Sequence, residues 1–299
     1  MRQHSKDTVA VRRFVLSKLD WFLKYRGYEV CGVSELRQFF SYLSRGHEEA
    51  GGRWGNAQLT RPMRPVTVAT YHKHVRTLFS WIVTEGILES SPMDRIPPPV
   101  VRSDQVRPFT PDQDRAILEA AQRSRHRRRD EAIVLFLLDT GLRASEVCNL
   151  RFTDVDLDGR RCRVLGKGNK YRTVYFGRNC AKALWQYLKA EPHESDEPLF
   201  VSDRGTSAGE AFTRNGLFQL IQRLGVAAGI QATRCSPHTF RHTFAVEFLR
   251  AGGNTFTLKE LLGHTSLHLT NKYVALAQAD LEAQHRAFSP GDRTKRRAA

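Results

Sequence analysis

A proline-rich segment near residue 100 constrains this chain more than any other feature of its sequence. Six prolines lie between positions 90 and 111, including the run Pro97-Pro98-Pro99. Proline fixes φ and lacks a backbone N–H, so neither a helix nor a central strand continues through such a stretch. A chain of 299 residues is also long enough for two domains of ordinary size. We therefore expect two folding units joined by an extended linker. The expected boundaries are 1–95 for the first unit, 96–108 for the linker, 109–288 for the second unit and 289–299 for a basic tail.

The pattern of the first unit is entirely helical. Apolar residues recur at helical spacing over 7–25 and 67–86, and a shorter apolar stripe follows Ser34, a favoured N-cap residue. Residues 46–65 contain four glycines and two prolines, a composition typical of a loop. The sequence thus predicts a small helical bundle with one long loop, to which it assigns no function.

The second unit mixes helices with a few short strands. Thr110 and Pro111 are typical of the N-cap and first position of a helix, which we expect to end near Gln122. The period of apolar residues then changes and predicts short strands separated by glycine turns. The predicted strands are 155–157, 161–165 and 172–176, and the predicted helices are 130–139, 143–150, 178–189, 210–228, 238–251 and 256–263, with further helix around Tyr273 and to about residue 287. The predicted fold class is mainly α, a helical unit followed by an α+β unit with a small antiparallel sheet.

Both predicted units are basic. The chain carries 47 Lys and Arg against 31 Asp and Glu, and 17 of the basic and 10 of the acidic residues precede Pro108. An excess of positive charge in both units favours a polyanion that both contact, and double-stranded DNA is the leading candidate. The alternative is a basic protein without such a partner. Membrane-surface binding fits less well, because no basic amphipathic helix stands out.

The cysteines and the N-terminus indicate where the protein acts. The five cysteines form no CxxC motif, so we expect reduced thiols. Residues 1–7 are polar and lack the apolar core of a signal peptide, and the longest apolar run, 132–138, is too short to cross a bilayer. We expect a soluble, cytoplasmic protein.

Four local clusters in the second unit carry side chains suited to phosphate chemistry. They are Thr140 to Glu146, with Arg143 in a first helical turn; Gly166 to Arg172, a basic hairpin tip; His238 to His242, on one helix; and Leu261 to His264, followed nine residues later by Tyr273. Taken singly, each has an ordinary structural explanation. His238 and His242 have the spacing of a zinc pair, but there is no HExxH motif and no clear third ligand.

Taken in order, these clusters resemble the tyrosine recombinase family, also called the phage integrase family. The resemblance covers about 109–287, and residues 66–81 with Ser91-Pro92 are similar to the family's core-binding domain, a SAM-like helical fold. It implies a site-specific recombinase that cleaves DNA through a 3′-phosphotyrosyl bond, exchanges strands through a Holliday junction and uses no metal or other cofactor. The chain begins directly with the core-binding domain, which favours a simple recombinase of the Xer type or a transposon-borne one.

The resemblance implies a role for each motif residue. Tyr273 is the nucleophile, and Arg143 and Arg241 neutralise the charge that develops on the phosphate. Lys167 protonates the leaving 5′ oxygen, with Lys170 as the competing candidate. The supporting residues are His238 for proton transfer with the tyrosine, His264 as a hydrogen-bond donor to the phosphate, and Glu146 as the carboxylate that orients the cations.

The resemblance also implies partners. A homo-tetramer is expected on DNA recombination sites, with helix 277–287 docked either on a neighbouring protomer or on its own domain. The expected DNA contacts are His72, Lys73 and Arg76 on helix 67–86, and Lys170 and Arg172 on the hairpin. Two other functions stay open, a type IB topoisomerase that relaxes supercoils and a DNA-binding regulator without catalysis. The target site, the biological role (integration, excision, dimer resolution or transposition) and any accessory or directionality proteins also stay open.

Overall fold

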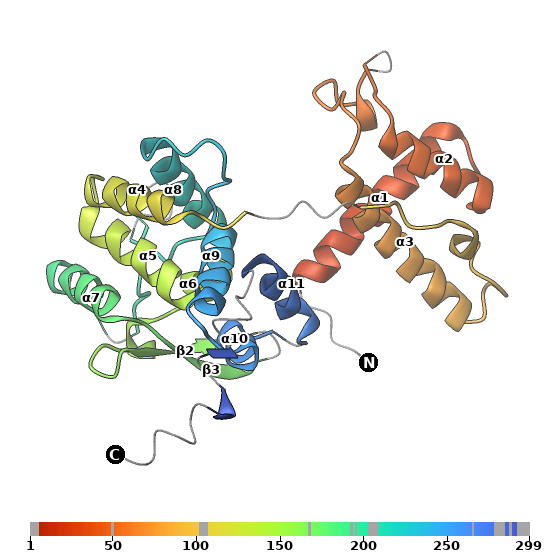
Figure 1. Ribbon diagram of the computed structural model, residues 1–299. Coiled ribbons are helices and arrows are strands. Elements are labelled where there is room, and N and C mark those ends of the chain that lie inside the picture. Colours follow the sequence, from red (N-terminus) through yellow and green to blue (C-terminus); the bar gives the residue numbers. More distant parts are fainter. Residues whose placement is uncertain are drawn as a thin grey trace. The chain divides into compact units, whose positions relative to one another are not determined.

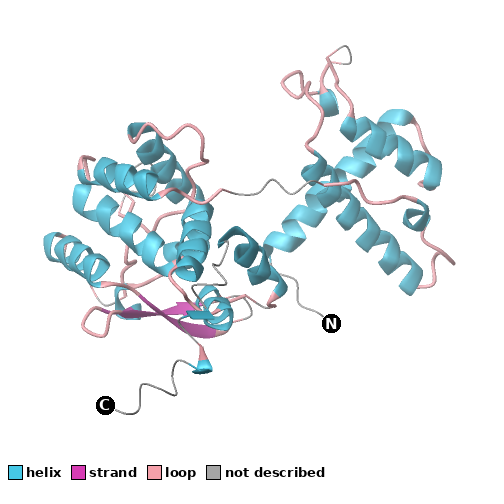
Figure 2. Cartoon of the chain, viewed as in Figure 1, coloured by secondary structure: helices cyan, strands magenta, loops and turns pink. Residues whose placement is uncertain are grey.

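The computed structural model describes residues 6–48, 51–101, 107–166, 169–191, 194, 196–202, 209–264, 266–277, 285–286 and 289–291. The chain divides into two compact units, Met1–Asp104 and Gln105–Ala299, shown in Figures 1 and 2. Each unit has its own hydrophobic core. Several predicted features lie outside the described residues: linker residues 102–106, Lys167 in the hairpin, most of helix 277–287 and the tail from residue 292.

Three α-helices form the described part of the first unit. They are α1 (Lys6–Arg26), α2 (Val33–Ser44) and α3 (Pro65–Thr84), with short 3-10 turns at Arg53–Gly55 and Pro92–Arg95. The predicted helices are confirmed, and their apolar stripes meet in a core rich in aromatic rings, among them Phe22, Phe39 and Phe79. The predicted N-cap Ser34 is wrong. Gly32 is the N-cap instead, because its backbone N–H donates to the Glu35 carboxylate at 2.9 Å.

The loop over residues 46–65 has a defined backbone. His47 N–H donates to the Thr60 carbonyl at 2.7 Å, and Arg53 N–H donates to the Leu59 carbonyl at 2.9 Å. Gly52 has φ +86, and a Cβ there would lie 1.8 Å from a backbone oxygen, so this position requires glycine. The composition predicted a loop, but these hydrogen bonds fold it into a compact element on the first unit.

The second unit is built around α5 (Arg127–Thr140). The other helices of its main body are α4 (Pro111–Gln122), α6 (Ala144–Cys148), α7 (Arg178–Ala190), α8 (Arg214–Ala227) and α9 (Pro237–Arg250). Helix α5 packs against α4, α7 and α9, and it buries Ile133, Phe136 and Leu137 completely. The start of α4 is confirmed, because Thr110 Oγ1 accepts from the Gln113 N–H at 3.3 Å.

Three antiparallel strands lie at one edge of the second unit (Figure 2). They are β1 (Val155–Asp156), β2 (Arg161–Leu165) and β3 (Tyr171–Tyr175), paired in the order β1-β2-β3. In the hairpin of β2 and β3, Cys162 pairs with Val174 and Val164 pairs with Arg172. Because side chains alternate along a strand, this register puts all four residues on the inward face of the sheet. The predicted small antiparallel sheet is confirmed.

A smaller apolar cluster forms between α9, α10 (Thr255–Leu262) and α11 (His268–Ala277). Its buried members include Val246, Leu258, Leu262 and Tyr273. Helix α11 packs against both α9 and α10. The candidate nucleophile therefore lies on a helix with an apolar core separate from the main core of the unit.

Two further observations concern membrane-spanning helices and cysteines. Among the described residues, no helix combines the length and the apolar character that crossing a bilayer requires. All five cysteines are free thiols, and four of them are buried.

Candidate active site

Two glycine turns bring distant parts of the second unit together. Gly141 ends α5 with φ +57, and a Cβ there would lie 2.5 Å from the Phe244 ring. Gly263 ends α10 in the same left-handed conformation, with φ +62. Residues with a side chain rarely adopt this conformation, so both turns depend on glycine. They place Arg143 at the start of α6 and His264 directly after α10.

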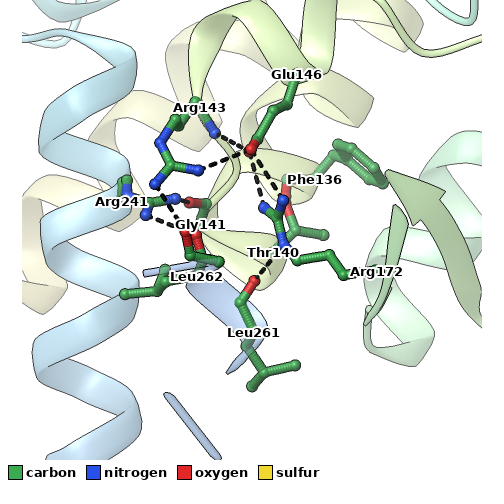
Figure 3. A network of polar contacts seen from close by, with 10 residues as sticks. Phe136, Thr140, Gly141, Arg143, Glu146, Arg172, Arg241, Leu261 and Leu262 are labelled. Atoms are coloured by element: carbon green, nitrogen blue, oxygen red, sulfur yellow. Dashed lines mark hydrogen bonds and ion pairs between the residues drawn. The ribbon is translucent and has the colours of Figure 1, made fainter. Parts of the chain in front are cut away.

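Glu146 is the carboxylate on which two arginines converge (Figure 3). Its oxygens accept hydrogen bonds from the Arg143 backbone N–H at 2.9 Å and from the Arg143 guanidinium at 2.8 Å. The guanidinium of Arg172, from β3, donates to both oxygens of the same carboxylate at 2.8 and 2.9 Å. Bidentate pairs of this kind are the strongest hydrogen bonds between side chains. The Glu146 side chain is only 5% exposed, so the α6 turn and the hairpin share one buried ionic anchor.

Three arginines also bind three successive carbonyls where α10 ends. Arg172 Nε donates to the Leu261 carbonyl at 2.9 Å, and Arg241 Nη2 donates to the Leu262 carbonyl at 2.8 Å. Arg143 Nη2 donates to the carbonyl of the next residue, Gly263, at 3.1 Å. The last carbonyls of a helix lack partners within it and form the negative end of its dipole, so they attract cations. The arrangement fixes the guanidiniums relative to the segment that carries His264.

The site has an excess of positive charge. Burial would raise the pKa of Glu146, but the hydrogen bonds from Arg172 and Arg143 outweigh it and hold that pKa below its usual range. Burial and the nearby charge of Arg143 lower the pKa of Arg241 to about 10, which leaves it protonated at neutral pH. One carboxylate therefore faces three guanidiniums, and the remaining positive charge suits a phosphate group.

The imidazoles of the site are kept neutral. Burial, with the charges of Arg241 and Arg143, lowers the pKa of His264 to about 4. Burial and the neighbouring His238 lower the pKa of His242 to about 4, and partial burial and Arg241 lower that of His238. Neutral imidazoles can accept a proton at neutral pH. His264 is oriented by a 2.9 Å hydrogen bond between its Nδ1 and the Thr270 hydroxyl.

Tyr273 lies close to two of these histidines and is affected by the charges of two arginines. Its ring is 2% exposed, and its centroid lies 5.3 Å from that of His242 and 6.2 Å from that of His264. Burial raises the pKa of the phenol, while the charges of Arg241 and Arg143 act in the opposite direction. The phenol is therefore protonated at rest and needs a base to remove its proton. The guanidiniums of Arg241 and Arg143 are close enough to stabilise the negative charge of the phenolate.

The structure brings most of the predicted catalytic residues into one cluster. Its predicted members are Arg143, Glu146, His238, Arg241, His264 and Tyr273. Lys167 lies outside the described residues, whereas Lys170 is described and exposed on the hairpin.

The structure places two of the predicted DNA contacts largely inside the protein. Arg172 points inward, with its side chain 14% exposed, because it shares the inward face of β3 with Val174. His72 is 4% exposed, and its Nε2 lies 2.9 Å from the Ile96 carbonyl within the core of the first unit. It occupies the same face of α3 as Val68 and Val75, a spacing that was visible in the sequence.

Sequence reasoning missed three neighbours of the candidate nucleophile. His242 was considered only as a helix-surface residue or a zinc ligand, although the i, i+4 spacing places it beside His238, with ring centroids 5.1 Å apart. The Lys272 ammonium lies 5.0 Å from the Tyr273 ring centroid. Thr270, which holds His264, is completely buried. Lys272 and Thr270 lie within three residues of Tyr273 in the sequence, and this closeness could have identified them.

Comparison with known proteins agrees with the geometry of this site. Residues 107–280 match the phage integrase family. A tyrosine recombinase XerC of Roseiflexus castenholzii is 33% identical over 233 residues, covering 75% of this chain and 72% of that protein. A tyrosine recombinase XerC of Mycobacterium tuberculosis is 34% identical over 275 residues, covering 86% of this chain and 91% of that protein.

Solved structures are similar over nearly the whole chain. The crystal structure of XerA recombinase is 27% identical with a TM-score of 0.54, covering 96% of this chain and 93% of that one. The Tn1549 transposon integrase in complex with transposon right end DNA is 19% identical with a TM-score of 0.70, covering 91% and 90%. The XerH recombinase bound to palindromic difH substrate is 20% identical with a TM-score of 0.67, covering 95% and 80%. At identities near 20%, the last two establish likeness of fold.

Proposed function

The chain belongs to the phage integrase family and is a tyrosine-type site-specific recombinase; on that premise we propose that Tyr273 is the nucleophile that cleaves and rejoins the DNA strands. The observation that carries the proposal is the convergence of Arg143, Arg241 and His264 on the buried Tyr273. These side chains come from α6, α9 and the segment after α10, and the carbonyls at the end of α10 hold both arginines in place.

Arg143 and Arg241 are proposed to bind the scissile phosphate. Each uses part of its guanidinium to hold the protein together, and Arg143 remains 34% exposed towards a ligand. When a phenolic oxygen attacks phosphorus, negative charge develops on the non-bridging oxygens of the pentavalent transition state. Fixed guanidiniums stabilise that charge without having to reorganise.

Proton transfer is proposed to use the neutral histidines and a hairpin lysine. The phenolic oxygen forms a bond to phosphorus, its proton passes to His238, and the bond between phosphorus and the 5′ oxygen breaks. A lysine ammonium, Lys167 or Lys170, gives a proton to the leaving 5′ oxygen, while His264 donates a hydrogen bond to the phosphate. The reverse reaction with another 5′ hydroxyl joins the strands, so no external energy source is needed.

The substrate is proposed to be double-stranded DNA carrying a specific recombination site. The XerH and Tn1549 structures are complexes with DNA, and the net charge of this chain is +16. Lys73 and Arg76 are exposed on α3 and are the proposed contacts of the first unit, as Lys170 is on the hairpin. Strand exchange between two sites through a Holliday junction requires four protomers, so a tetramer on DNA is proposed. Cellular DNA as the substrate favours the cytoplasm as the site of action.

Covalent capture tests the proposed nucleophile. A pool of nicked duplexes with a randomised central sequence releases a short fragment after cleavage, which traps the protein on DNA. The wild-type chain is expected to form an adduct that survives detergent, and sequencing of the trapped DNA yields the preferred site. Tyr273→Phe is expected to bind the selected duplex with unchanged affinity and to form no adduct. An adduct formed by Tyr273→Phe would exclude Tyr273 as the nucleophile.

The same selected duplex separates recombination from two other functions. Two copies on one plasmid should recombine in the presence of the wild-type chain, whereas a topoisomerase would relax supercoils without exchanging partners. A DNA-binding regulator would bind the duplex without forming an adduct. Family membership favours recombination over both alternatives.

A further inference from the structure

Arg172 uses all three nitrogens of its guanidinium within the protein. Nη1 and Nη2 donate to the two oxygens of Glu146 at 2.9 and 2.8 Å, and Nε donates to the Leu261 carbonyl at 2.9 Å. Figure 3 shows this group entering the site on a different side of Glu146 from Arg143. The side chain is 14% exposed. Its donors are directed at protein acceptors, so a DNA phosphate has little of this guanidinium to bind.

Two glycines leave room for the Arg172 guanidinium. A Cβ on Gly263 would lie 3.1 Å from its central carbon, and a Cβ on Gly166 would lie 3.2 Å from Nη1. Such distances are shorter than ordinary van der Waals contact, so a side chain at either position would displace the guanidinium. The planar group therefore packs closely between the hairpin and the end of α10, and its orientation is set by packing as well as by hydrogen bonds.

The partners of Arg172 connect three parts of the active site. Glu146 also holds the Arg143 guanidinium, and Leu261 lies three residues before His264. Arg172 itself is on β3, near the tip of the hairpin that carries Lys170. A shift of Arg172 would therefore alter the relative positions of a phosphate-binding arginine, a histidine and a hairpin lysine.

We propose that Arg172 is a positioning residue for strand cleavage, which acts through Glu146 and the Leu261 carbonyl and not by contacting DNA. It keeps the hairpin, the Arg143 guanidinium and the segment before His264 in the geometry that the reaction needs. The inference rests on the proposed nucleophilic role of Tyr273. Misplacement of reacting groups by about 1 Å can reduce a rate on the order of 100-fold.

The test separates DNA binding from cleavage. Single-turnover cleavage of the selected nicked duplex is measured at saturating protein for Arg172→Gln and Arg172→Lys, and the affinity for the intact duplex is measured in parallel. Arg172→Gln is expected to slow cleavage by about 10- to 100-fold with unchanged affinity. Arg172→Lys keeps the charge but cannot reproduce the two-oxygen contact, so it should slow cleavage to a similar extent.

Arg161→Gln is the matched control. Arg161 lies on the neighbouring strand β2 and also binds a carboxylate, that of Asp156 at 2.8 Å, but it is 59% exposed and faces away from the site. This variant should cleave at the wild-type rate. The cleavage rate of the double variant Arg172→Gln, Glu146→Gln separates a positioning role from a merely structural one. Because both substitutions disrupt the same Arg172–Glu146 contact, the rate loss of the double variant should be smaller than the product of the two single losses.

Three outcomes would overturn the inference. Cleavage at the wild-type rate by folded Arg172→Gln and Arg172→Lys would leave Arg172 a stabilising residue only. A loss of DNA affinity that matches the loss of rate would make Arg172 a DNA contact. Rate losses that multiply in the double variant would show that Arg172 acts independently of Glu146. A wild-type chain that forms no adduct would instead refute the proposed nucleophile, so the two failures are distinguishable.

Discussion

The two sides of the active site are held by different forces. On the cation side, Arg143, Arg172 and Arg241 are tied to Glu146 and to the carbonyls at the end of α10 by short hydrogen bonds. On the nucleophile side, the Tyr273 ring packs in an apolar cluster between α9, α10 and α11. The Tyr273 ring lies beside the rings of His242 and His264, and no hydrogen bond joins its hydroxyl to another described residue.

This difference matches the different requirements of the two sides, fixed charges on one and a mobile nucleophile on the other. Charges that stabilise a transition state are most effective when they are already oriented before substrate arrives, and a buried hydrogen-bond network provides that orientation. A nucleophile must instead approach phosphorus and later leave it. An apolar contact is not directional, so a helix held mainly in this way can shift at a lower cost, although α11 would have to break the hydrogen bond between Thr270 and His264. We expect substitutions on the cation side to cost more stability than polar substitutions on the nucleophile side.

The largest effect is expected for Glu146→Ala. It leaves the buried Arg172 and the half-buried Arg143 without their carboxylate, and removal of one partner of a buried pair costs about 3–5 kcal/mol. Chemical denaturation of the wild-type and variant chains measures the difference. Arg161→Ala, which breaks the exposed pair with Asp156 and leaves the hydrogen bond between Asp156 and the Gly159 N–H in place, is the control and should change stability little. Equal losses in the two variants would break the comparison between a buried network and an ordinary surface pair.

The pH dependence of the same carboxylate sharpens this prediction. The folded-state pKa of Glu146 lies below its usual range, so its contribution to stability is fully present above the unfolded pKa, about 4.3. That contribution is lost as the pH falls through the folded pKa. The stability advantage of the wild-type chain over Glu146→Gln should therefore be constant at neutral pH and shrink below about pH 4.3.

The residues of this network followed from the resemblance of the ordered motifs to a known family, but the contacts that connect them did not. The order of the motifs predicted that Arg143, Arg241 and Tyr273 share one site. The glycine after α5 predicted a turn that places Arg143 at the start of α6. The three guanidinium–carbonyl contacts join residues 143, 172 and 241 to residues 261–263. Such contacts depend on how α9, α10 and the hairpin pack, which periodicity along the chain does not specify.

The error in placing two predicted DNA contacts on the surface has one physical cause. Basic side chains were assigned to the surface, because an unpaired charge is rarely buried. His72 is buried because its ring finds the Ile96 carbonyl, and Arg172 is buried because its partners satisfy the guanidinium. In both cases the strand or helix period, which places these residues on an apolar face, was a better guide than their charge.

An intermediate effect is expected for Arg241→Ala. The Arg241 guanidinium is 2% exposed and donates to the carbonyls of Gly141 and Leu262, which would lose these partners. Leaving buried acceptors unsatisfied costs about 1–3 kcal/mol, and cleavage should fall by about 100- to 1,000-fold because one of the two guanidiniums proposed to bind the phosphate is lost. Denaturation and single-turnover cleavage measure the two effects. A variant with wild-type stability would mean that the carbonyl contacts organise the site without supporting the fold.

The smallest effect on stability is expected for Tyr273→Phe, the variant with the most complete loss of activity. Phenylalanine keeps the ring that packs in the α9, α10 and α11 cluster, and the hydroxyl it lacks has no hydrogen bond to lose among the described residues. The free energy of unfolding should change by less than about 0.5 kcal/mol, whereas Tyr273→Ala, which opens a cavity, should cost about 3–5 kcal/mol. Denaturation of the two variants separates the contribution of the ring from that of the hydroxyl. If Tyr273→Phe lost more than about 1 kcal/mol, the hydroxyl would have a hydrogen-bond partner in solution, and the nucleophile would be anchored in the same way as the cations that face it.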